Sequence, residues 1–200
     1  MIAVDLDGTL VTRNTFRIFA GFLRRRILKR RRIADLARYG FWGAARRFNM
    51  VSHRRLKWEL MKIADNTLTP EDYDNLADEI MQYLNPRVTD YVTGKPWVLA
   101  TAASTEYVMP LARRLDCLYV IATERPVSRR FKDYTETRGA EKLRRVHAVT
   151  GIAGIDVALS DHPDDLPLLM AAHTPVLVNP TAATLADPGI KALGATVWRD

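Results

Sequence analysis

The strongest constraint on the fold of this 200-residue chain is the alternation of short apolar runs with helical patterns from Pro86 onward. Alternation of this kind predicts an α/β fold, with a parallel sheet that has helices on both faces. The predicted elements are helix 86–94, strand 97–101, helix 105–115, strand 117–122, an irregular or hairpin stretch 123–137, helix 139–149, strand 155–159, helix 163–172, strand 175–178, a short helix near 181–187 and strand 195–198.

The N-terminus adds one more strand that ends in two carboxylates. Residues 2–4 have the pattern of a buried strand, and Asp5, Asp7 and Gly8 follow directly. Ligands bind at the carboxyl ends of strands in open α/β sheets, and side chains two apart share a face of a strand. Two close acids favour a hard divalent cation, most simply Mg²⁺. An ordinary strand and turn with surface acids is the alternative interpretation of this motif alone.

Residues 15–84 contain no convincing strand and predict an insertion of about four helices. Thr69 and Pro70 have the pattern of a helix N-cap followed by its first residue. We therefore predict an α/β core from residues 1–14 and 85–200, with a helical domain at 15–84 inserted into it. Apolar residues recur at helical spacing in four groups: Phe16, Phe19, Ala20 and Leu23; Ile33, Leu36, Ala37 and Phe41; Leu56, Leu60 and Ile63; and Leu76, Ile80 and Leu84.

Three further polar groups stand at strand ends or helix starts. Thr101 ends one predicted strand, Lys142 lies near the start of a helical pattern after Gly139, and Asp161 and Asp165 follow strand 155–159. Parallel strands bring such groups to one edge of a sheet. Thr101 and Lys142 also have simpler structural interpretations, and a neighbouring acid could take the place of Asp165. The alternatives are Thr101 or Ser104 as a helix N-cap, Lys142 as a solvated lysine beside Arg144 and Arg145, and Asp164 in place of Asp165.

Taken in order, these four features resemble the four sequence motifs of the haloacid dehalogenase (HAD) superfamily. The resemblance covers roughly residues 1–14 and 86–180, and its first and last motifs are the specific ones. The helical insertion directly after the first motif resembles that of the phosphoserine-phosphatase-like branch. The resemblance implies a HAD-like, Rossmann-type sheet with an inserted helical cap over the site.

The resemblance also implies a role for each matching residue. Asp5 matches the nucleophile that forms an aspartyl-phosphate, and Asp7 matches the acid/base residue, which favours phosphoester hydrolysis over carbon–halogen chemistry. Thr101, the backbone N–H of Ala102 and Lys142 match the groups that bind the phosphoryl oxygens.

The predicted metal ligands for Mg²⁺ are Asp5, the backbone carbonyl of Asp7, and Asp161, while Asp165 is expected to orient Lys142 or a metal-bound water. Two departures from the family pattern stand out in this sequence. Ser160 and His162 flank Asp161 where the family often has glycine and serine, and His162 is either a bystander or a group that touches solvent, metal-bound water or substrate. Residues 123–137 lack the expected glycine-containing hairpin, which weakens phosphoserine as the substrate.

The net charge of +7 is spread unevenly. Residues 13–62 contain 16 of the 30 Lys and Arg residues and only two acids, Asp35 and Glu59, so this segment is +14 and the remainder is −7. Solvated helix faces explain such charge most simply. The positive charge also suits an anionic substrate, an anionic membrane or nucleic acid as a partner. Aromatic residues are interleaved with the charges, which suits a membrane surface or a contact with another subunit.

We therefore expect a Mg²⁺-dependent phosphatase that hydrolyses a small phosphomonoester through an aspartyl-phosphate on Asp5, with the substrate unknown. The alternatives are a phosphotransferase, or a non-catalytic protein that binds acidic lipid or nucleic acid through its basic insertion. Cys117 is the single cysteine, and the sequence shows no signal peptide and no apolar run of about eighteen residues. A cytoplasmic location without a transmembrane segment is the matching expectation.

Overall fold

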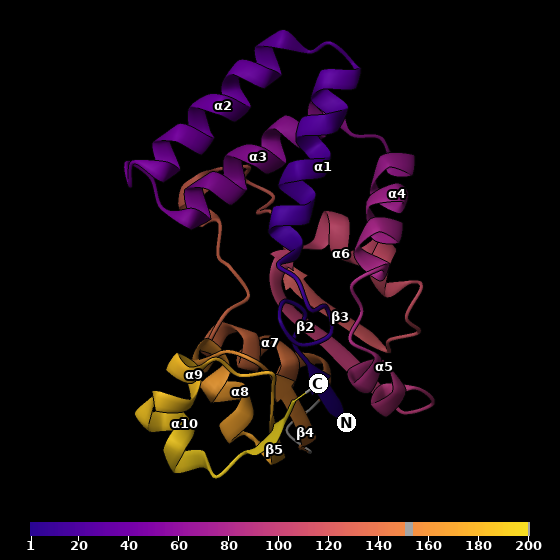
Figure 1. Ribbon diagram of the computed structural model, residues 1–200, viewed down its shortest axis with the longest axis vertical. Helices are drawn as coiled ribbons and strands as arrows, with labels where there is room; N and C mark the ends of the chain where they lie inside the picture. Colours follow the sequence, from indigo (N-terminus) through magenta and orange to yellow (C-terminus); the bar gives the residue numbers. More distant parts are fainter. Residues whose placement is uncertain (151–153, 200) are drawn as a thin grey trace.

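The computed structural model describes residues 1–150 and 154–199, and in these residues six parallel strands form one sheet in the order β3-β2-β1-β4-β5-β6 (Figure 1). The central strand β1 pairs with β2 on one side and β4 on the other. The chain thus runs outward on one side of β1 and then returns to the other side, which creates a crevice at the carboxyl ends of β1, β2 and β4. The strands are β1 (Ile2–Val4), β2 (Trp97–Ser104), β3 (Tyr119–Thr123), β4 (Ile155–Ser160), β5 (Ala172–Val178) and β6 (Thr196–Trp198).

Helices cover both faces of this sheet, as the alternating pattern predicts. Val4 and Leu99 belong to an apolar cluster on one face, which includes residues of α5 and α6, whereas Ala3 and Val98 belong to a cluster with residues of α7, α8 and α10. Adjacent residues of a strand point to opposite faces, so each strand contributes to both clusters. The core helices are α5 (Pro86–Val92), α6 (Thr105–Ala112), α7 (Ala140–Thr150), α8 (Leu166–Met170), α9 (Ala182–Ala186) and α10 (Pro188–Leu193).

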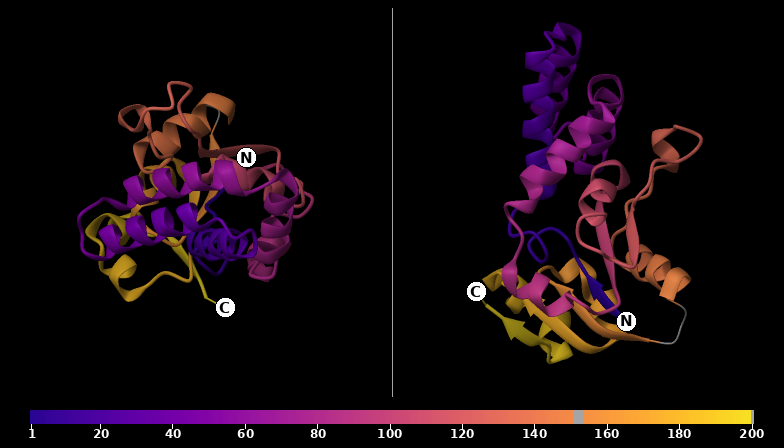
Figure 2. Two further views of the ribbon diagram at one scale, coloured as in Figure 1. Left: turned by 90° about the horizontal axis from the view of Figure 1, so that it is seen from above. Right: turned by 90° about the vertical axis from the view of Figure 1, so that its right-hand side faces the viewer.

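Residues 15–81 form four helices that extend away from the sheet, with α2 farthest from it (Figures 1 and 2). A capping box begins α4, in which Thr69 and Asp72 bond each other's backbone N–H groups, as the Thr69-Pro70 pattern predicts. Most of the predicted apolar positions of α1, α3 and α4 are buried, whereas Ile33, Ala37 and Phe41 of α2 are exposed. The helices are α1 (Thr15–Lys29), α2 (Ile33–Arg47), α3 (His53–Thr67) and α4 (Pro70–Met81).

Residues 124–138 connect β3 to α7 and lie against α3 (Figure 1). Within this fully described segment the regular structure is a short 3₁₀ turn, η1 (Phe131–Asp133), so the irregular alternative is confirmed and the hairpin is not formed. Trp58 of α3 contacts Tyr134, with ring centroids 5.2 Å apart. Lys57 of α3 forms an ion pair with Glu136 at 2.7 Å. These contacts tie the insertion to the core at a point close to the sheet edge.

Several predicted boundaries differ from the structure for local reasons. Strand β2 continues to Ser104 because a shift in its pairing with β3 lies between Ala100 and Ser104. The predicted helix 163–172 is instead the 3₁₀ turn η2 (Pro163–Asp165) followed by α8. The helix predicted near 181–187 is α9, and a further helix, α10, follows it because Asp187 caps a new helix. Residues 151–153 and 200 of the predicted core range lie outside the described residues. No helix in the described ranges has the length and hydropathy of a membrane-spanning segment.

Candidate active site

The turn after β1 positions Asp5 at the centre of the sheet edge. The Asp5 N–H donates to the Leu159 carbonyl of β4 at 2.9 Å, which continues the sheet by one residue. Gly8 then adopts a positive φ of 82°, and its N–H donates to the Val11 carbonyl at 2.8 Å. A Cβ atom at Gly8 would overlap the carboxylate of Asp161. The missing side chain therefore lets the motif after β1 approach the motif after β4.

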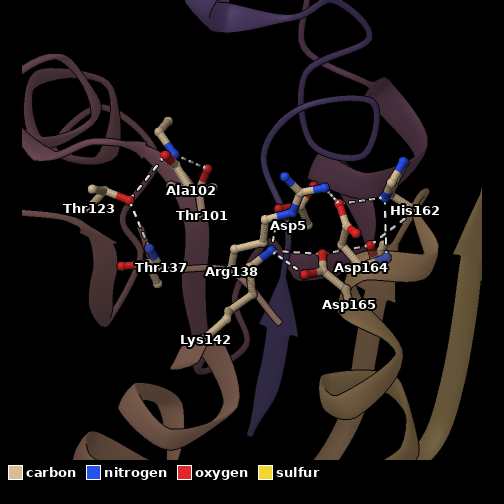
Figure 3. A network of polar contacts seen from close by, with 12 residues as sticks. Asp5, Thr101, Ala102, Thr123, Thr137, Arg138, Lys142, His162, Asp164 and Asp165 are labelled. Carbon is tan, nitrogen blue, oxygen red and sulfur yellow. Dashed lines mark hydrogen bonds and ion pairs between the residues drawn. The ribbon is translucent and has the colours of Figure 1, made fainter. Parts of the chain in front are cut away.

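Lys142 is the centre of the buried charge cluster (Figure 3). Its Nζ donates to Asp5 Oδ1 at 2.7 Å and to Asp165 at 2.7 Å, and the Ser160 hydroxyl donates to Asp165 at 2.8 Å. The side chains of Lys142, Asp5 and Asp165 are each at most one-tenth exposed. Lys142 is thus not a solvated helix lysine, and Asp165, rather than Asp164, is the acid that contacts it.

Burial and neighbouring charges shift the pKa values in this cluster. Burial raises the pKa of Asp5 to about 8, Lys142 opposes that rise, and the carboxylates of Asp165 and Asp161 add to it. Burial also raises the pKa of Asp161 to about 6, with further rises from Asp165 and Asp7 against a lowering by His162. Burial acts to lower the pKa of Lys142, but Asp5 and Asp165 outweigh it, so that pKa is raised. The site contains more negative than positive charge, and a bound cation would relieve the excess.

Asp7 faces the base of the helical insertion. Its Oδ1 accepts a hydrogen bond from the N–H of Thr15, the first residue of α1, at 2.6 Å. A carboxylate at a helix N-terminus is stabilised by the N–H groups that lack a partner within the helix. Among the described residues Asp7 forms no salt bridge, unlike Asp5 and Asp165. Its carboxylate is therefore not paired with a cation, in contrast to that of Asp5.

Thr101 and Ala102 lie near the end of β2, beside Asp5 in Figure 3. The Thr101 hydroxyl oxygen is buried and accepts from the N–H of Ala103 at 3.0 Å. The N-cap of α6 is Ser104, so the alternative of Thr101 as an N-cap is wrong. The carbonyl of Ala102 accepts from the Thr123 hydroxyl at 3.0 Å and from Lys57 Nζ at 3.3 Å.

Sequence reasoning missed the residues that fix the Ala102 peptide. The Thr123 hydroxyl donates to Ala102 and accepts from the N–H of Thr137 at 2.9 Å, and the Thr137 hydroxyl donates to the Ala122 carbonyl at 2.9 Å (Figure 3). Thr123 ends β3, so the strand-end rule that selected Thr101 could have selected it as well. Lys57 carries no local signal, because it is one of sixteen basic residues in its segment.

A second polar network lies at the rim of the site. Arg138 forms an ion pair with Asp164, whose side chain also lies 2.9 Å from the His162 Nδ1 atom. The same nitrogen of His162 accepts from the Asp164 N–H at 3.2 Å. The partly exposed His162 ring thus contacts Asp164, while the His162 N–H donates to the Ser160 hydroxyl at 3.3 Å.

The donor set fits a hard cation. The predicted ligands are two carboxylates, of Asp5 and Asp161, and the backbone carbonyl of Asp7. A group of three or more His, Cys, Asp or Glu residues that could hold a metal is not found among the described residues. Mg²⁺ is commonly bound by one or two carboxylates, with water and substrate phosphate completing the octahedron. Burial is the main cause of the raised pKa values of Asp5 and Asp161, and the carboxylate of Asp165 adds to both. A cation bound to these oxygens would offset the repulsion between the carboxylates.

A larger cavity of about 1280 Å³ lies to one side of this site. Its lining includes Trp58 and Tyr73 of the insertion and Glu106 and Arg125 of the core. None of the residues predicted to act in catalysis, phosphate binding or metal binding lines it. The polar cluster around Lys142, not this cavity, is therefore the candidate active site.

Comparison with models of protein families agrees with the resemblance found in the sequence. A model of the haloacid dehalogenase-like hydrolase family matches residues 2–170. The chain belongs to the haloacid dehalogenase-like hydrolase family. A search of curated proteins finds no match.

Solved structures share the fold over almost the whole chain at low identity. A protein of unknown function from Bordetella pertussis Tohama I is 21% identical with a TM-score of 0.71, and the match covers 98% of this chain and 96% of that one. A phosphoserine phosphohydrolase-like protein from Francisella tularensis subsp. tularensis SCHU S4 is 17% identical with a TM-score of 0.56, covering 100% and 94%. An apo phosphoserine phosphatase is 17% identical with a TM-score of 0.55, covering 98% and 91%.

Proposed function

We propose that this hydrolase is a Mg²⁺-dependent phosphatase that cleaves a phosphomonoester through an aspartyl-phosphate on Asp5. The observation that carries the proposal is the position of Lys142, which bridges Asp5 and Asp165 at 2.7 Å in a buried site. These residues come from three distant parts of the sequence, and the Ser160 hydroxyl supports the third. A buried lysine that holds one oxygen of a carboxylate leaves the other oxygen available for attack.

In the first step, Asp5 attacks the phosphorus atom of the substrate. A bond forms between its free carboxylate oxygen and phosphorus, and the bond from phosphorus to the ester oxygen breaks. Asp7 gives a proton to the departing oxygen, so that the leaving group departs as an alcohol. Lys142 favours the ionised form of Asp5, because its charge opposes the rise in pKa that burial causes.

In the second step, water hydrolyses the aspartyl-phosphate. Asp7, now a carboxylate, accepts a proton from the attacking water, and the bond between phosphorus and Asp5 breaks. Inorganic phosphate leaves, and both Asp5 and the protonated Asp7 return to their starting states. An alcohol in place of water would give a phosphotransferase with the same residues, so product analysis with an added alcohol distinguishes the two reactions.

The phosphoryl oxygens are held by groups from two elements. Thr101 and the N–H of Ala102 offer hydrogen bonds from β2, and Lys142 offers its charge from α7. Asp5, the Asp7 carbonyl and Asp161 would hold Mg²⁺, which when bound neutralises charge on the phosphoryl group. Asp165 orients Lys142 through their direct contact.

Residues 15–84 act in this proposal as a cap over a core formed by 1–14 and 85–200. Lys57 of α3 reaches the Ala102 carbonyl, so the insertion contacts the phosphate-binding peptide directly. Phosphoserine phosphatase is among the structures with this fold. We leave the substrate class at small phosphomonoesters, because residues 124–138 do not form the hairpin expected of the phosphoserine enzymes.

The test is hydrolysis of an aryl phosphate by the wild type with Mg²⁺, by the wild type with EDTA, and by Asp5→Asn with Mg²⁺. We expect turnover with Mg²⁺ and a loss of at least about 1,000-fold in the variant, since removal of a nucleophile has effects of this order or larger. EDTA should abolish turnover as well. Equal turnover by Asp5→Asn would contradict the proposal. Asp116→Asn, an exposed acid away from the site, is the matched control.

A further inference from the structure

Helix α2 has apolar side chains on the side that faces the protein, where Leu36, Tyr39 and Trp42 pack against the core, and also on the side that faces solvent. Asp35 is buried, whereas Ile33 is 79% exposed and Phe41 61% exposed. Ala37 and Ala44 are exposed at the same helical spacing, and the apolar surface continues past the helix end to Phe48, which is 73% exposed. Residues three and four apart lie on one side of a helix, so these side chains form a single stripe. An ordinary surface helix presents polar rather than apolar side chains to solvent.

The segment that contains this stripe has far more cations than acids to pair with them. The segment from Arg24 to Arg55 contains twelve Lys and Arg residues and a single acid, Asp35. Asp35 is already paired with Arg32 and Arg38. Within the described residues, salt bridges are absent for four exposed cations in or near the stripe, namely Arg24, Lys29, Arg31 and Arg47.

We propose that the outer surface of α2 docks on an anionic lipid bilayer. We call this surface, formed by Ile33, Ala37, Phe41, Ala44 and Phe48, the α2 stripe. Aromatic and aliphatic side chains enter the boundary between headgroups and acyl chains, while arginines at the edge contact anionic headgroups. The position of α2 at the end of the molecule farthest from the sheet leaves the stripe accessible to a flat surface (Figure 1).

The composition of the stripe favours lipid over the other partners. Nucleic acid is bound through phosphate contacts to cations, which gives no role to an exposed Ile33, Phe41 and Phe48 in line. A second copy of the chain would bring two segments of the same strong positive charge together, which opposes association. A bilayer with anionic headgroups offers an apolar layer and negative charge at once.

The first test is co-sedimentation of the full-length protein with vesicles of phosphatidylcholine alone or with 30% phosphatidylglycerol, a composition we choose as the probe. We expect binding at least about tenfold stronger to the anionic vesicles, and a decrease as salt is added. Phe41→Ser with Phe48→Ser should reduce binding at least about tenfold, because the apolar anchors are lost. Both residues are mostly exposed, so the circular dichroism and melting temperature should not change.

Matched control variants distinguish binding through the α2 stripe from nonspecific electrostatic or hydrophobic binding to vesicles. Val127→Ser removes an exposed apolar residue of the α/β domain, away from the α2 stripe. Lys191→Glu reverses an exposed charge of the same domain and is the control for Arg47→Glu, which reverses a charge beside the stripe. We expect Arg47→Glu to weaken vesicle binding and both controls to leave it unchanged. Asp5→Asn should also bind normally, so failure of the phosphatase proposal and failure of this one are distinguishable.

Three results would overturn the proposal. The first is equal binding to neutral and anionic vesicles, or none to either. The second is vesicle binding by Phe41→Ser/Phe48→Ser that equals the wild type. The third is evidence for another partner: a wild-type dimer that is absent in the double variant, or binding to single-stranded RNA that is stronger than binding to vesicles.

Discussion

The sheet edge and the helical insertion use positive charge in opposite ways. At the sheet edge, Lys142 is buried between two carboxylates that lie 2.7 Å from it. In the insertion, Arg31 and Arg47 are exposed and, within the described residues, form no salt bridge. A buried, paired cation is fixed by the fold and sets the geometry of a reaction, whereas exposed, unpaired cations remain free for a partner. The number of basic residues in a region therefore says less than their burial and their pairing.

Lys142→Met gives the largest effect that we expect from this contrast. Its removal leaves two buried carboxylates without a cation, which destabilises the protein by about 3–5 kcal/mol. Loss of the charge that favours the ionised form of Asp5 should also reduce kcat at least about 100-fold. Chemical denaturation and aryl phosphate hydrolysis measure the two effects. Lys191→Met, an exposed lysine of α10, should change neither. Wild-type activity in Lys142→Met would remove the distinction between the two regions.

Asp72→Asn tests a structural charge within the insertion. Asp72 is buried, completes the capping box of α4 and pairs with Arg26 and Arg30. We expect a loss of about 2–3 kcal/mol in the free energy of unfolding with little change in kcat, because these contacts lie away from the site. Asp74→Asn, an exposed acid on the same helix, is the control.

The pH dependence of the Asp72 effect has a defined sign. Burial raises the pKa of Asp72, but the hydrogen bonds from Thr69 and the charges of Arg30 and Arg26 outweigh it and lower the pKa overall. A carboxyl group with a lowered pKa stabilises the fold above its ordinary value of 3.8 and loses this contribution as the pH falls through the folded-state pKa. The difference between the wild type and Asp72→Asn should therefore be full at pH 7 and shrink below about pH 4. A difference that grows with acid would contradict the assignment.

Thr123→Val probes the support of the Ala102 peptide, which we propose binds phosphate. The variant keeps the side-chain shape but cannot donate to the Ala102 carbonyl or accept from the Thr137 N–H. We expect about tenfold lower kcat/KM and about 1–2 kcal/mol of lost stability, because buried partners are left unsatisfied. Thr123→Ser, which retains the hydroxyl, should restore most of the activity. If both variants lose activity equally, the hydroxyl is not the relevant group.

Lys57→Met tests the link between the two regions and should have the smallest effect. Lys57 is mostly buried and joins α3 to Glu136 and to the Ala102 carbonyl. Its loss should lower kcat/KM about three- to tenfold while the protein remains folded, since the phosphate-binding peptide keeps its bond to Thr123. Lys62→Met, an exposed lysine of the same helix, is the matched variant. A change confined to stability would make Lys57 a purely structural contact.

The sequence predicted the sheet, the four inserted helices and the residues at strand ends, because each depends on a local pattern. Parallel strands bring their carboxyl ends together, so Asp5, Thr101 and Asp161 could be placed at one edge without knowledge of the tertiary contacts. The choice of Asp165 over Asp164 rested on family resemblance, and the structure shows that Asp165 contacts Lys142. Their roles in catalysis stay predictions.

Features that depend on contacts between distant segments could not be predicted. Nothing local distinguishes Lys57 from its basic neighbours, and its contact with Ala102 depends on how α3 lies over the sheet edge. Helical spacing identified α2 but did not reveal which side is buried. Periodicity indicates which residues share a face of a helix, but not whether that face contacts the protein or solvent. Phe41 thus fits a helix equally well whether its side faces a core or solvent.

The most direct test of the central claim is the detection of the phosphorylated residue. The protein is mixed with an aryl phosphate and Mg²⁺, quenched in acid during turnover, and digested for peptide mass mapping, with Asp7→Asn used to slow hydrolysis of the intermediate. We predict one phosphoryl group on the N-terminal peptide at Asp5, and none in Asp5→Asn. Sustained turnover with no phosphoryl group on Asp5, or a phosphoryl group on another residue, would contradict the account.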